Sequence, residues 1–201
     1  WASRKIAELI DAVRQAGADP SITAQDPKIK ELVDEIVRLS TEFGILTEYT
    51  AFLAREGTDL ANPTSVRQEA IDFLSSRAMQ IRSGVGGVNQ SLNGIRQKEQ
   101  TELNLRNFYY DEGLNGVSIS NVQQVNDQAY YNRGSQWVDS RLVNREDRIT
   151  PARVIEFGSK EYFDLVHRLA RQNRQGSIAL TGDILLMVDG EPVLIKSPDV
   201  N

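Results

Sequence analysis

The amino-acid sequence predicts an α+β protein, with helices in its first half and short strands in its second. Up to about residue 105, apolar side chains recur every three or four residues, which is the spacing of an amphipathic helix. Beyond that point, short β-type runs are separated by turn signals such as Asn132-Arg133-Gly134 and Asp189-Gly190. A chain of 201 residues, 40% hydrophobic and 25% charged, has the composition of an ordinary globular protein and is long enough to bury a core.

The first part of the chain predicts two helices that form an antiparallel hairpin. Residues 3–16 carry an apolar stripe, with Ser3 as the expected N-cap and Gly17 as the expected stop. A second helix is expected to begin near Asp26, with a proline in its first turn, and to end at Gly44. Both helices are apolar on one side only, so each is expected to rest on another surface.

The segment after these helices predicts a strand and then one long helix. Ile45–Phe52 is rich in threonine and aromatic residues, which favour extended structure. Asn62 is expected to cap a helix that has Pro63 at its first position, and the helical spacing continues to about Leu105. Such a helix would have ~40 residues and a length of ~60 Å. The glycines within Ser83–Val88 leave two interpretations open: they divide the helix in two, or they allow another backbone to pack closely against it.

The second half predicts a small α+β unit with two β-hairpins. The strands of these hairpins are expected at Val122–Tyr131, Ser135–Ser140, Asp183–Val188 and Glu191–Lys196. Between the hairpins, Arg153–Phe157 predicts a strand, and Ser159 is expected to cap a helix over 160–173. The chain is therefore expected to have three parts, a helical hairpin with a strand, a long helical connector and a small α+β interaction domain, over residues 1–55, 56–110 and 111–201.

The composition excludes several classes of function. The 23 basic and 28 acidic residues give a net charge of −5, and no basic stripe with interleaved aromatic residues occurs, so we expect no nucleic-acid partner. The absence of cysteine excludes thiol catalysis, cysteine-type zinc sites and disulfides. The sequence has no apolar stretch of about 18 residues, so no segment is expected to span a membrane.

The residues best suited to acid–base catalysis have simpler explanations. His167 is the only histidine, and a lone histidine builds neither a catalytic triad nor a zinc site without partners. Glu31, Asp34 and Glu35 lie at helical spacing on the polar face of the second helix, where exposure to solvent is favoured over a role in glycoside hydrolysis. A hydrolase is therefore the least favoured class.

Two further segments have a superficial likeness to ligand sites. Ser83–Val88 is rich in glycine like a phosphate-binding loop, but it follows a helix and no Gly-Lys-Ser/Thr comes after it. Asp183, Asp189 and Glu191 are oxygen ligands that suit Ca²⁺, but the chemistry of the hairpin turn already explains Asp189. Neither segment is expected to bind a ligand.

Aromatic side chains supply the candidate binding residues of the second half, Tyr130, Tyr131 and Trp137. Together with Tyr109 and Tyr110, they would line a platform for a carbohydrate if they were exposed. The alternative, which the sequence favours, is that they pack across strands within a small sheet.

Several segments of the chain follow one another in an order that is typical of one protein family. They are Trp1–Ile6, Glu31–Leu53, Gly84–Arg96, Gln128–Asp139, Phe157–Phe163 and Leu180–Ile184. In these segments the chain resembles the region that follows the von Willebrand factor A (vWA) domain in bacterial proteins that join a vault/inter-alpha-trypsin (VIT) domain to a vWA domain. Glu48 and Ala51 depart from the family pattern, in which proline and serine are usual.

The resemblance implies a structural role in the family motifs for Trp1, Gly44, Tyr49, Phe52, Trp137, Phe157, Gly158, Tyr162 and Phe163. It implies no catalytic residue. The Mg²⁺ site of a vWA domain is opened by Asp-Xaa-Ser-Xaa-Ser, and this pattern is absent here. We therefore expect no cofactor in this chain, and Mg²⁺ only in an upstream vWA domain.

The function that the resemblance implies is a non-enzymatic binding or scaffold region of an exported protein, which mediates protein–protein interaction or adhesion. Because the chain opens on Trp1 rather than methionine, we expect it to begin inside a longer sequence, whose upstream domains are its first partners. The implied location is extracellular, periplasmic or at the cell surface.

An alternative function is that of a self-assembling structural component of the cell envelope. In this hypothesis the long helix is the seam of a homo-oligomer or the contact with other envelope proteins. Small residues at Gly84, Gly87, Ser91 and Gly94 would permit another helix to approach closely.

Overall fold

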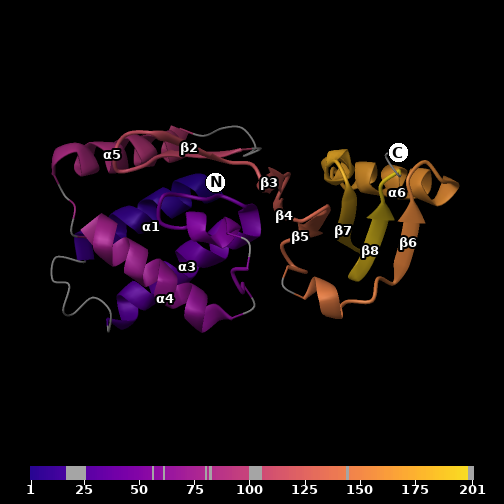
Figure 1. The fold of residues 1–201 in the computed structure, drawn as a ribbon, viewed down its shortest axis with the longest axis horizontal. Coiled ribbons are helices and arrows are strands. Elements are labelled where there is room, and N and C mark those ends of the chain that lie inside the picture. The colour runs from indigo at the N-terminus through magenta and orange to yellow at the C-terminus, as the bar shows by residue number, and fades with distance from the viewer. Residues whose placement is uncertain are drawn as a thin grey trace.

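The computed structural model describes residues 1–16, 26–55, 57–60, 62–79, 81, 83–99, 106–143 and 145–198. The helices of this part of the chain are α1 (Ala2–Ala16), α3 (Pro27–Phe43), α4 (Pro63–Phe73), α5 (Gly84–Glu99) and α6 (Lys160–Arg171). The first four form a helical part, and α6 packs on a mixed β-sheet in the second half, so the predicted α+β class is confirmed (Figure 1). None of the helices in the described ranges is both long enough and apolar enough to cross a membrane.

Helices α1 and α3 form the predicted antiparallel hairpin. The ring of Trp1, at the start of α1, lies 6.3 Å from the ring of Phe43, at the end of α3, so the two helices run in opposite directions. The Asp26 side chain accepts a hydrogen bond from the Lys28 N–H at 2.8 Å, which confirms it as the N-cap of α3. The predicted cap at Ser3 is wrong, because α1 begins at Ala2 and Ser3 is buried within its first turn. The predicted stop at Gly17 lies outside the described residues.

The predicted strand over Ile45–Phe52 does not form. The segment folds into turns that lead into a short 3₁₀ helix, η1 (Ala51–Ala54). The hydroxyl of Thr50 accepts from the Thr47 N–H at 2.9 Å, and the hydroxyl of Thr47 accepts from the Tyr49 N–H at 3.1 Å. Threonine favours strands, but here its hydroxyls satisfy the local backbone and so compete with strand pairing.

The predicted long helix is divided in two, as the first of the two interpretations expected. Its start is confirmed, because Asn62 caps α4 by accepting from the Ser65 N–H at 3.2 Å. Helix α4 continues into a π-helical turn, η2 (Leu74–Met79), and α5 begins anew at Gly84. Gly84 has a φ of 66°, which an uninterrupted right-handed helix does not allow. The two helices pack on different partners, α4 on α3 and α5 on α1.

The strands form a six-stranded mixed sheet and a separate hairpin. Their bounds are β1 (Asn107–Tyr110), β2 (Gly116–Ile119), β3 (Val122–Val125), β4 (Gln128–Arg133), β5 (Gln136–Asp139), β6 (Arg153–Glu156), β7 (Asp183–Val188) and β8 (Glu191–Lys196). The order in the large sheet is β3-β4-β5-β7-β8-β6, with β5 parallel to β7 and β6 parallel to β8. Among the described strands, β1 and β2 pair with each other and not with the large sheet.

Both predicted hairpins of the second half are present. The one formed by β7 and β8 has the predicted bounds, and both turn residues, Asp189 and Gly190, have positive φ as a type I′ turn requires. The other is formed by β4 and β5, but the predicted first arm, Val122–Tyr131, is wrong as a single strand. A turn at Asn126, whose φ is 55°, divides this arm into β3 and β4. Ser159 caps α6 as predicted, accepting from the Tyr162 N–H at 3.1 Å.

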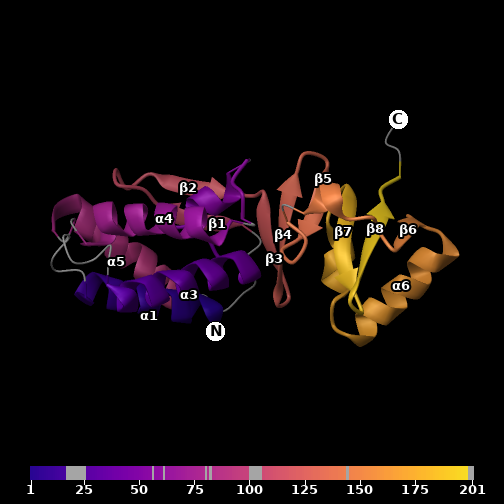
Figure 2. The ribbon, with the colours of Figure 1, turned by 90° about the horizontal axis from the view of Figure 1, so that it is seen from below.

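The large sheet is buried on both faces. Along β4, Ala129 and Tyr131 belong to a core shared with α1, α3, α4 and η1, whereas Tyr130 belongs to a second core beneath α6. Strand β7 alternates in the same way, with Leu185 in the first core and Ile184 in the second. Figure 2 shows the helical part and α6 on opposite sides of the strands. The first core therefore contains residues from all three ranges into which the sequence was divided.

Polar contacts add to this core where the helical part meets the strands. The buried Asn107 side chain accepts from the Leu46 N–H at 2.6 Å and donates to the Val122 carbonyl at 3.2 Å. The Tyr131 hydroxyl donates to the Thr41 carbonyl at 3.1 Å. Asn107 thus joins three segments that are distant in the sequence.

We expect Asn107→Ala to lower the free energy of unfolding by about 2–4 kcal/mol, because a buried N–H and a buried carbonyl would each lose a partner. Chemical denaturation followed by circular dichroism measures this change. Asn115→Ala is the matched control, since its side chain bonds Asp111 in the exposed turn of the same hairpin and water can replace it. An equal loss in both variants would contradict the role assigned to Asn107.

Candidate functional site

Helix α5 is inverted relative to an ordinary amphipathic helix. Its buried residues are polar, with Asn89 at 1%, Gln90 at 5% and Asn93 at 6% exposure. Its large apolar residues are exposed, with fractions of 56%, 51%, 42% and 52% for Val85, Val88, Leu92 and Ile95. We refer to these four residues as the apolar stripe of α5.

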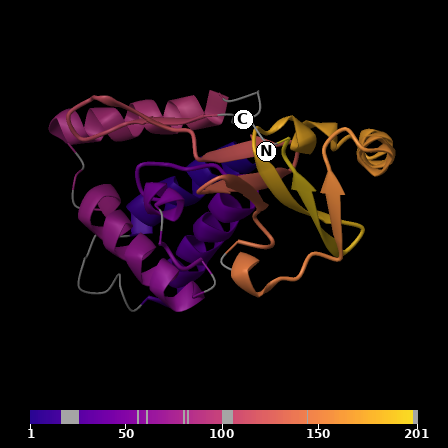
Figure 3. The same ribbon diagram turned by 45° about the vertical axis from the view of Figure 1, so that its right-hand side comes forward.

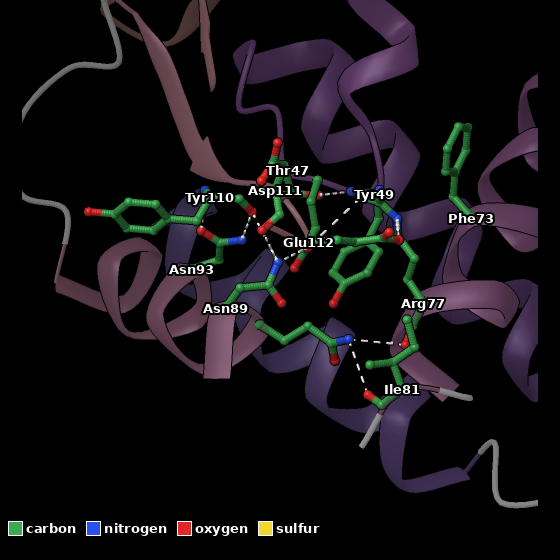
Figure 4. Close-up of polar contacts among 12 residues, drawn as sticks. Thr47, Tyr49, Phe73, Arg77, Ile81, Asn89, Asn93, Tyr110, Asp111 and Glu112 are labelled. Atoms are coloured by element: carbon green, nitrogen blue, oxygen red, sulfur yellow. Dashed lines mark hydrogen bonds and ion pairs between the residues drawn. The ribbon is translucent and has the colours of Figure 1, made fainter. Parts of the chain in front are cut away.

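The Asn93 side chain attaches α5 to the β1–β2 hairpin. Its oxygen accepts from the Tyr110 N–H at 2.8 Å, and its amide donates to the Tyr110 carbonyl at 2.8 Å. The amide therefore pairs with the backbone of β1 as a neighbouring strand would (Figure 4). On the same side, the Arg96 guanidinium lies 4.2 Å from the centre of the Phe108 ring. Figure 3 shows α5 and this hairpin side by side along one edge of the molecule.

The side chains of Asn89 and Gln90 donate to backbone carbonyls of the segments that border α5. The Asn89 amide donates to the Asp111 carbonyl at 2.6 Å, and the Gln90 amide donates to the carbonyls of Arg77 and Ile81, both at 3.1 Å (Figure 4). Buried polar groups that keep their hydrogen bonds are tolerated, whereas exposing these carbonyls to an apolar neighbour would be costly. These bonds fix the rotation of α5 and hold its apolar stripe outward.

A buried carboxylate lies in the centre of this polar cluster. Glu48 is 4% exposed, and its Oε2 accepts from the Asn89 amide at 3.3 Å. Arg77 lies 4.0 Å from the same oxygen and 3.0 Å from Glu112, so its charge is shared between a buried carboxylate and an exposed one.

The surroundings of Glu48 favour its protonated form. Burial raises the pKa of the Glu48 carboxyl above its ordinary value, and contacts with Asn93, Tyr49, Arg77 and Asn89 oppose this shift without reversing it. Within the geometry limits of a hydrogen bond, Glu48 Oε1, Asn89 Oδ1 and Gln90 Oε1 have no donor in the described part of the chain. A cluster with more acceptors than donors is stabilised by an added proton, which agrees with the direction of the shift.

The aromatic candidates do not form an exposed platform. Tyr130 and Tyr131 are 0% exposed and point to opposite faces of the sheet, and Trp137 is 6% exposed with its indole N–H donating to the Thr181 carbonyl at 3.1 Å. Their alternative role, packing within the sheet, accounts for these positions. Of the five aromatic residues considered together, Tyr109 and Tyr110 lie in β1 and are partly exposed.

Most of the positions for which the sequence analysis expected a structural role lie in turns or in the cores. Tyr49, Phe52 and Tyr162 are buried, while Gly44 and Gly158 have φ values of 64° and 76°. A Cβ added at Gly44 would lie 3.0 Å from the Cβ of Ala129, so the end of α3 approaches the sheet closely. Trp137 is buried as well, whereas the other three members of the set are exposed: Trp1, Phe157 and Phe163 at 78%, 53% and 52%.

The carboxylates proposed for catalysis are not gathered in a cleft. Glu35 is paired with Arg38 at 2.8 Å and Asp34 with Arg67, while Glu31 is exposed on the same helix. Two of the carboxylates considered for Ca²⁺ have partners, Asp183 with Lys196 at 2.6 Å and Asp189 with Arg168 at 3.0 Å, and the third, Glu191, is exposed. His167 is exposed on α6. Within the described ranges, no three histidine, cysteine or acidic side chains lie together as metal ligands would.

A groove of about 570 Å³ lies between α3, α4 and the end of β5. Its charged lining residues pair with one another or with near neighbours: Asp34 with Arg67, Arg38 with Glu35 and Glu42, and Arg141 with Asp139. The groove therefore presents no isolated charge, among the described residues, that would select a charged ligand.

Sequence reasoning missed the polar cluster because its signal is divided between distant segments. Asn89, Gln90 and Asn93 form a polar stripe on the side of α5 away from its apolar stripe. This polar stripe was the one signal in the sequence that either face of the helix could be buried. Its partners, Glu48 and the backbone of Tyr110, lie far away in the sequence.

Comparisons of the chain with protein-family models, with curated proteins and with solved structures found no match.

We expect Glu48→Gln to stabilise the protein increasingly as the pH rises. An acid whose pKa is raised on folding binds its proton more tightly in the folded state, so the wild-type protein loses stability as the pH rises from the ordinary value of 4.5 through the folded pKa. The neutral glutamine does not titrate. The advantage of Glu48→Gln should therefore be small near pH 4, grow across this window and become constant above it.

Denaturation midpoints of both proteins at a series of pH values measure this difference. Glu112→Gln is the matched control, because Glu112 contacts the same Arg77 from an exposed position. A stability advantage of Glu48→Gln that shrinks with rising pH would mean that the carboxylate is stabilised, not destabilised, by its surroundings.

Proposed function

We propose that this chain is a non-enzymatic binding and scaffold module that docks a protein partner on the apolar stripe of α5. One observation carries the proposal: α5 buries its polar face and leaves four large apolar side chains about half exposed. Contiguous apolar surface of this kind is typical of protein interaction sites.

The energetics of α5 support this function. Burying the stripe would stabilise the protein by on the order of 1 kcal/mol for each half-exposed side chain. The fold forgoes this gain and instead orders a polar cluster that contains a destabilised carboxylate. Proteins are expected to be less stable than they could be at the residues that their function requires.

The residues suited to catalysis give this proposal further support. The acidic side chains of α3 are exposed or paired with arginine. Near β7 and β8, Asp183 and Asp189 are paired with Lys196 and Arg168, and Glu191 is exposed. These are the contacts of a solvated surface. A binding role therefore requires fewer assumptions than a hydrolytic one.

The resemblance to VIT–vWA proteins extends the proposal to the cellular setting. In that setting the chain is part of an exported protein, located outside the cell, in the periplasm or at the cell surface. Its partners are the upstream domains of the same protein, other envelope proteins or a second copy, and adhesion depends on Mg²⁺ bound by an upstream vWA domain. The alternative function, a self-assembling component of the envelope, requires a helix that contacts the next subunit. The sequence analysis assigned this contact to one long helix, and in the structure α5 is the part of that segment that could form it.

Photocrosslinking in cells tests whether α5 is a docking surface. With benzoylphenylalanine at position 92 of the full protein, we expect a crosslinked adduct of defined mass, because a docked partner lies against the stripe. The same photoreactive residue at Gln68, an exposed position on α4, is the control. Mass spectrometry identifies the adduct. Equal yields of crosslinks from positions 92 and 68 would contradict the proposal.

A further inference from the structure

The dipeptide Asn-Gly occurs twice in the chain, in nearly identical local sequences. Leu92-Asn93-Gly94-Ile95 lies in α5, and Leu114-Asn115-Gly116-Val117 lies in the β1–β2 hairpin. Asparagine before glycine is prone to deamidation, because glycine has no side chain to hinder the approach of its nitrogen to the asparagine amide. The two sites share one chemistry, so the fold alone decides which of them reacts.

Deamidation proceeds through a ring that the backbone forms. The glycine N–H loses its proton to hydroxide, and its nitrogen forms a bond to the side-chain carbon Cγ of asparagine. The bond from Cγ to the amide nitrogen breaks, and this nitrogen leaves as ammonia after taking a proton from the solvent. Water then opens the ring at either of its two carbonyl carbons, so the reaction consumes one water and yields aspartate or isoaspartate. It requires a glycine N–H outside the hydrogen-bonded ladder and an asparagine side chain that can turn toward it.

The fold protects Asn93 at both groups that must react. Its side-chain amide makes two hydrogen bonds of 2.8 Å to the backbone of Tyr110, and the residue is 6% exposed (Figure 4). The N–H of Gly94 lies inside α5, where it is directed to the carbonyl of Gln90, one turn earlier. Ring formation at Asn93 therefore requires α5 to open and to leave the hairpin.

The N–H of Gly116, by contrast, points away from the neighbouring strand. Opposite residues of an antiparallel pair alternate between those that exchange backbone hydrogen bonds and those that do not. Asp111 donates to the Asn115 carbonyl at 3.0 Å, so the next opposite pair, Tyr110 with Gly116, is of the second kind. Tyr110 agrees with this, since its N–H and its carbonyl both bond the Asn93 side chain instead. The N–H of Gly116 is thus directed to the outer side of the hairpin, and this residue is exposed.

The Asn115 side chain lies in an exposed turn and is held weakly. Its amide nitrogen lies 3.2 Å from each oxygen of the Asp111 carboxylate, at the long end of the range for a hydrogen bond. Because water can replace both contacts, the side chain can turn toward Gly116.

Packing requires glycine at position 116. A Cβ there would lie 2.8 Å from two ring carbons of Phe108. That ring is in turn covered by Arg96 of α5, whose guanidinium lies 4.2 Å from the ring centre. Any side chain at this position would slow deamidation but would also displace the Phe108 ring.

We infer that Asn115 is a site of spontaneous deamidation in the folded chain and that the fold protects Asn93 from the same reaction. This inference does not depend on the proposed docking function. The product places a second carboxylate beside that of Asp111, and the two repel each other. Isoaspartate in addition lengthens the main chain by one carbon, so β2 loses its register with β1. Because the Asp111 carbonyl accepts from Asn89, the change reaches the contacts that orient α5.

Peptide mapping of the purified 201-residue chain tests this inference. The chain is incubated at mildly alkaline pH in heavy-oxygen water, and mass spectrometry measures how much heavy oxygen residues 93 and 115 have gained. Only deamidation during the incubation adds this label. We expect Asn115 to react at least on the order of tenfold faster than Asn93, because a buried part of the chain must open before Asn93 can react. The rate at Asn115 should rise with the hydroxide concentration.

The same chain unfolded in urea is the matched control. Both asparagines stand between leucine and glycine, with a β-branched residue next, so their rates should be similar once the fold is removed. Asn115→Gln in the folded chain should remove the label at position 115, because glutamine would have to form a larger ring. Equal rates at the two sites in the folded chain, or no reaction at Asn115 while both sites react in urea, would overturn the inference.

Asn115→Asp reproduces the charged product and tests its effect on the hairpin. At neutral pH we expect its Tm to lie below that of Asn115→Ala, because aspartate repels the Asp111 carboxylate and alanine does not. The difference should shrink when salt is added, since salt screens exposed charges. Equal Tm values for the two variants would overturn the effect on the hairpin.

Discussion

The burial of the large sheet on both faces is the constraint on which the rest of the structure depends. Because successive residues of a strand point to opposite faces, β4 must supply an apolar side chain at every position of its centre, and it does so with Ala129-Tyr130-Tyr131. One face receives the helical part and the other receives α6. The aromatic residues that could have served as a binding platform are therefore needed for the two cores. The large apolar side chains that are exposed in the described part of the chain lie away from the sheet centre, on α5, near the start of α6 and at Trp1, Leu114 and Val154.

The polar cluster under α5 determines which surface the helical part presents. Both faces of α5 could be buried, one by apolar contacts and the other by side-chain hydrogen bonds. The carbonyls of Arg77, Ile81, Tyr110 and Asp111 favour the polar face, because they accept from its amides and the apolar face has no donor to offer. Those of Arg77 and Asp111 accept in addition from the N–H groups of Ile81 and Leu114. Glu48 adds an acceptor that is not fully satisfied by donors. The cluster therefore orients α5 but lowers the stability of the fold to some extent. Hydrogen bonds from α5 side chains to the neighbouring backbone thus fix the rotation of α5 about its own axis.

Local signals in the sequence predicted much of the fold. The caps at Asp26, Asn62 and Ser159 and the Asp189-Gly190 turn act through neighbouring backbone groups, so a single sequence reveals them. The failures arose where two local tendencies compete or where distant partners decide. Thr47 and Thr50 favour strands but bond the local backbone, and the π-helical turn after α4 reflects packing against other helices. The parallel pairing of β5 with β7 has no local signal. The candidate site was predicted least well, since the apolar stripe of α5 is visible in the sequence but its exposure depends on Glu48 and Tyr110.

The order of the strands also has a consequence for how the chain folds. The β4–β5 and β7–β8 hairpins have short turns and can form early from contacts within each segment. The parallel pairing of β5 with β7 closes a long loop that contains β6 and α6, so it carries a larger entropic barrier and is expected to form later. The first core includes side chains from these strands, and until the sheet is assembled the helical part lacks Tyr131, Val138 and Leu185 to pack against. During synthesis, the helices leave the ribosome well before these strands do. The nascent helical part is then an intermediate whose apolar faces are exposed to solvent. We expect that it must be kept from aggregating until β7 has been synthesised.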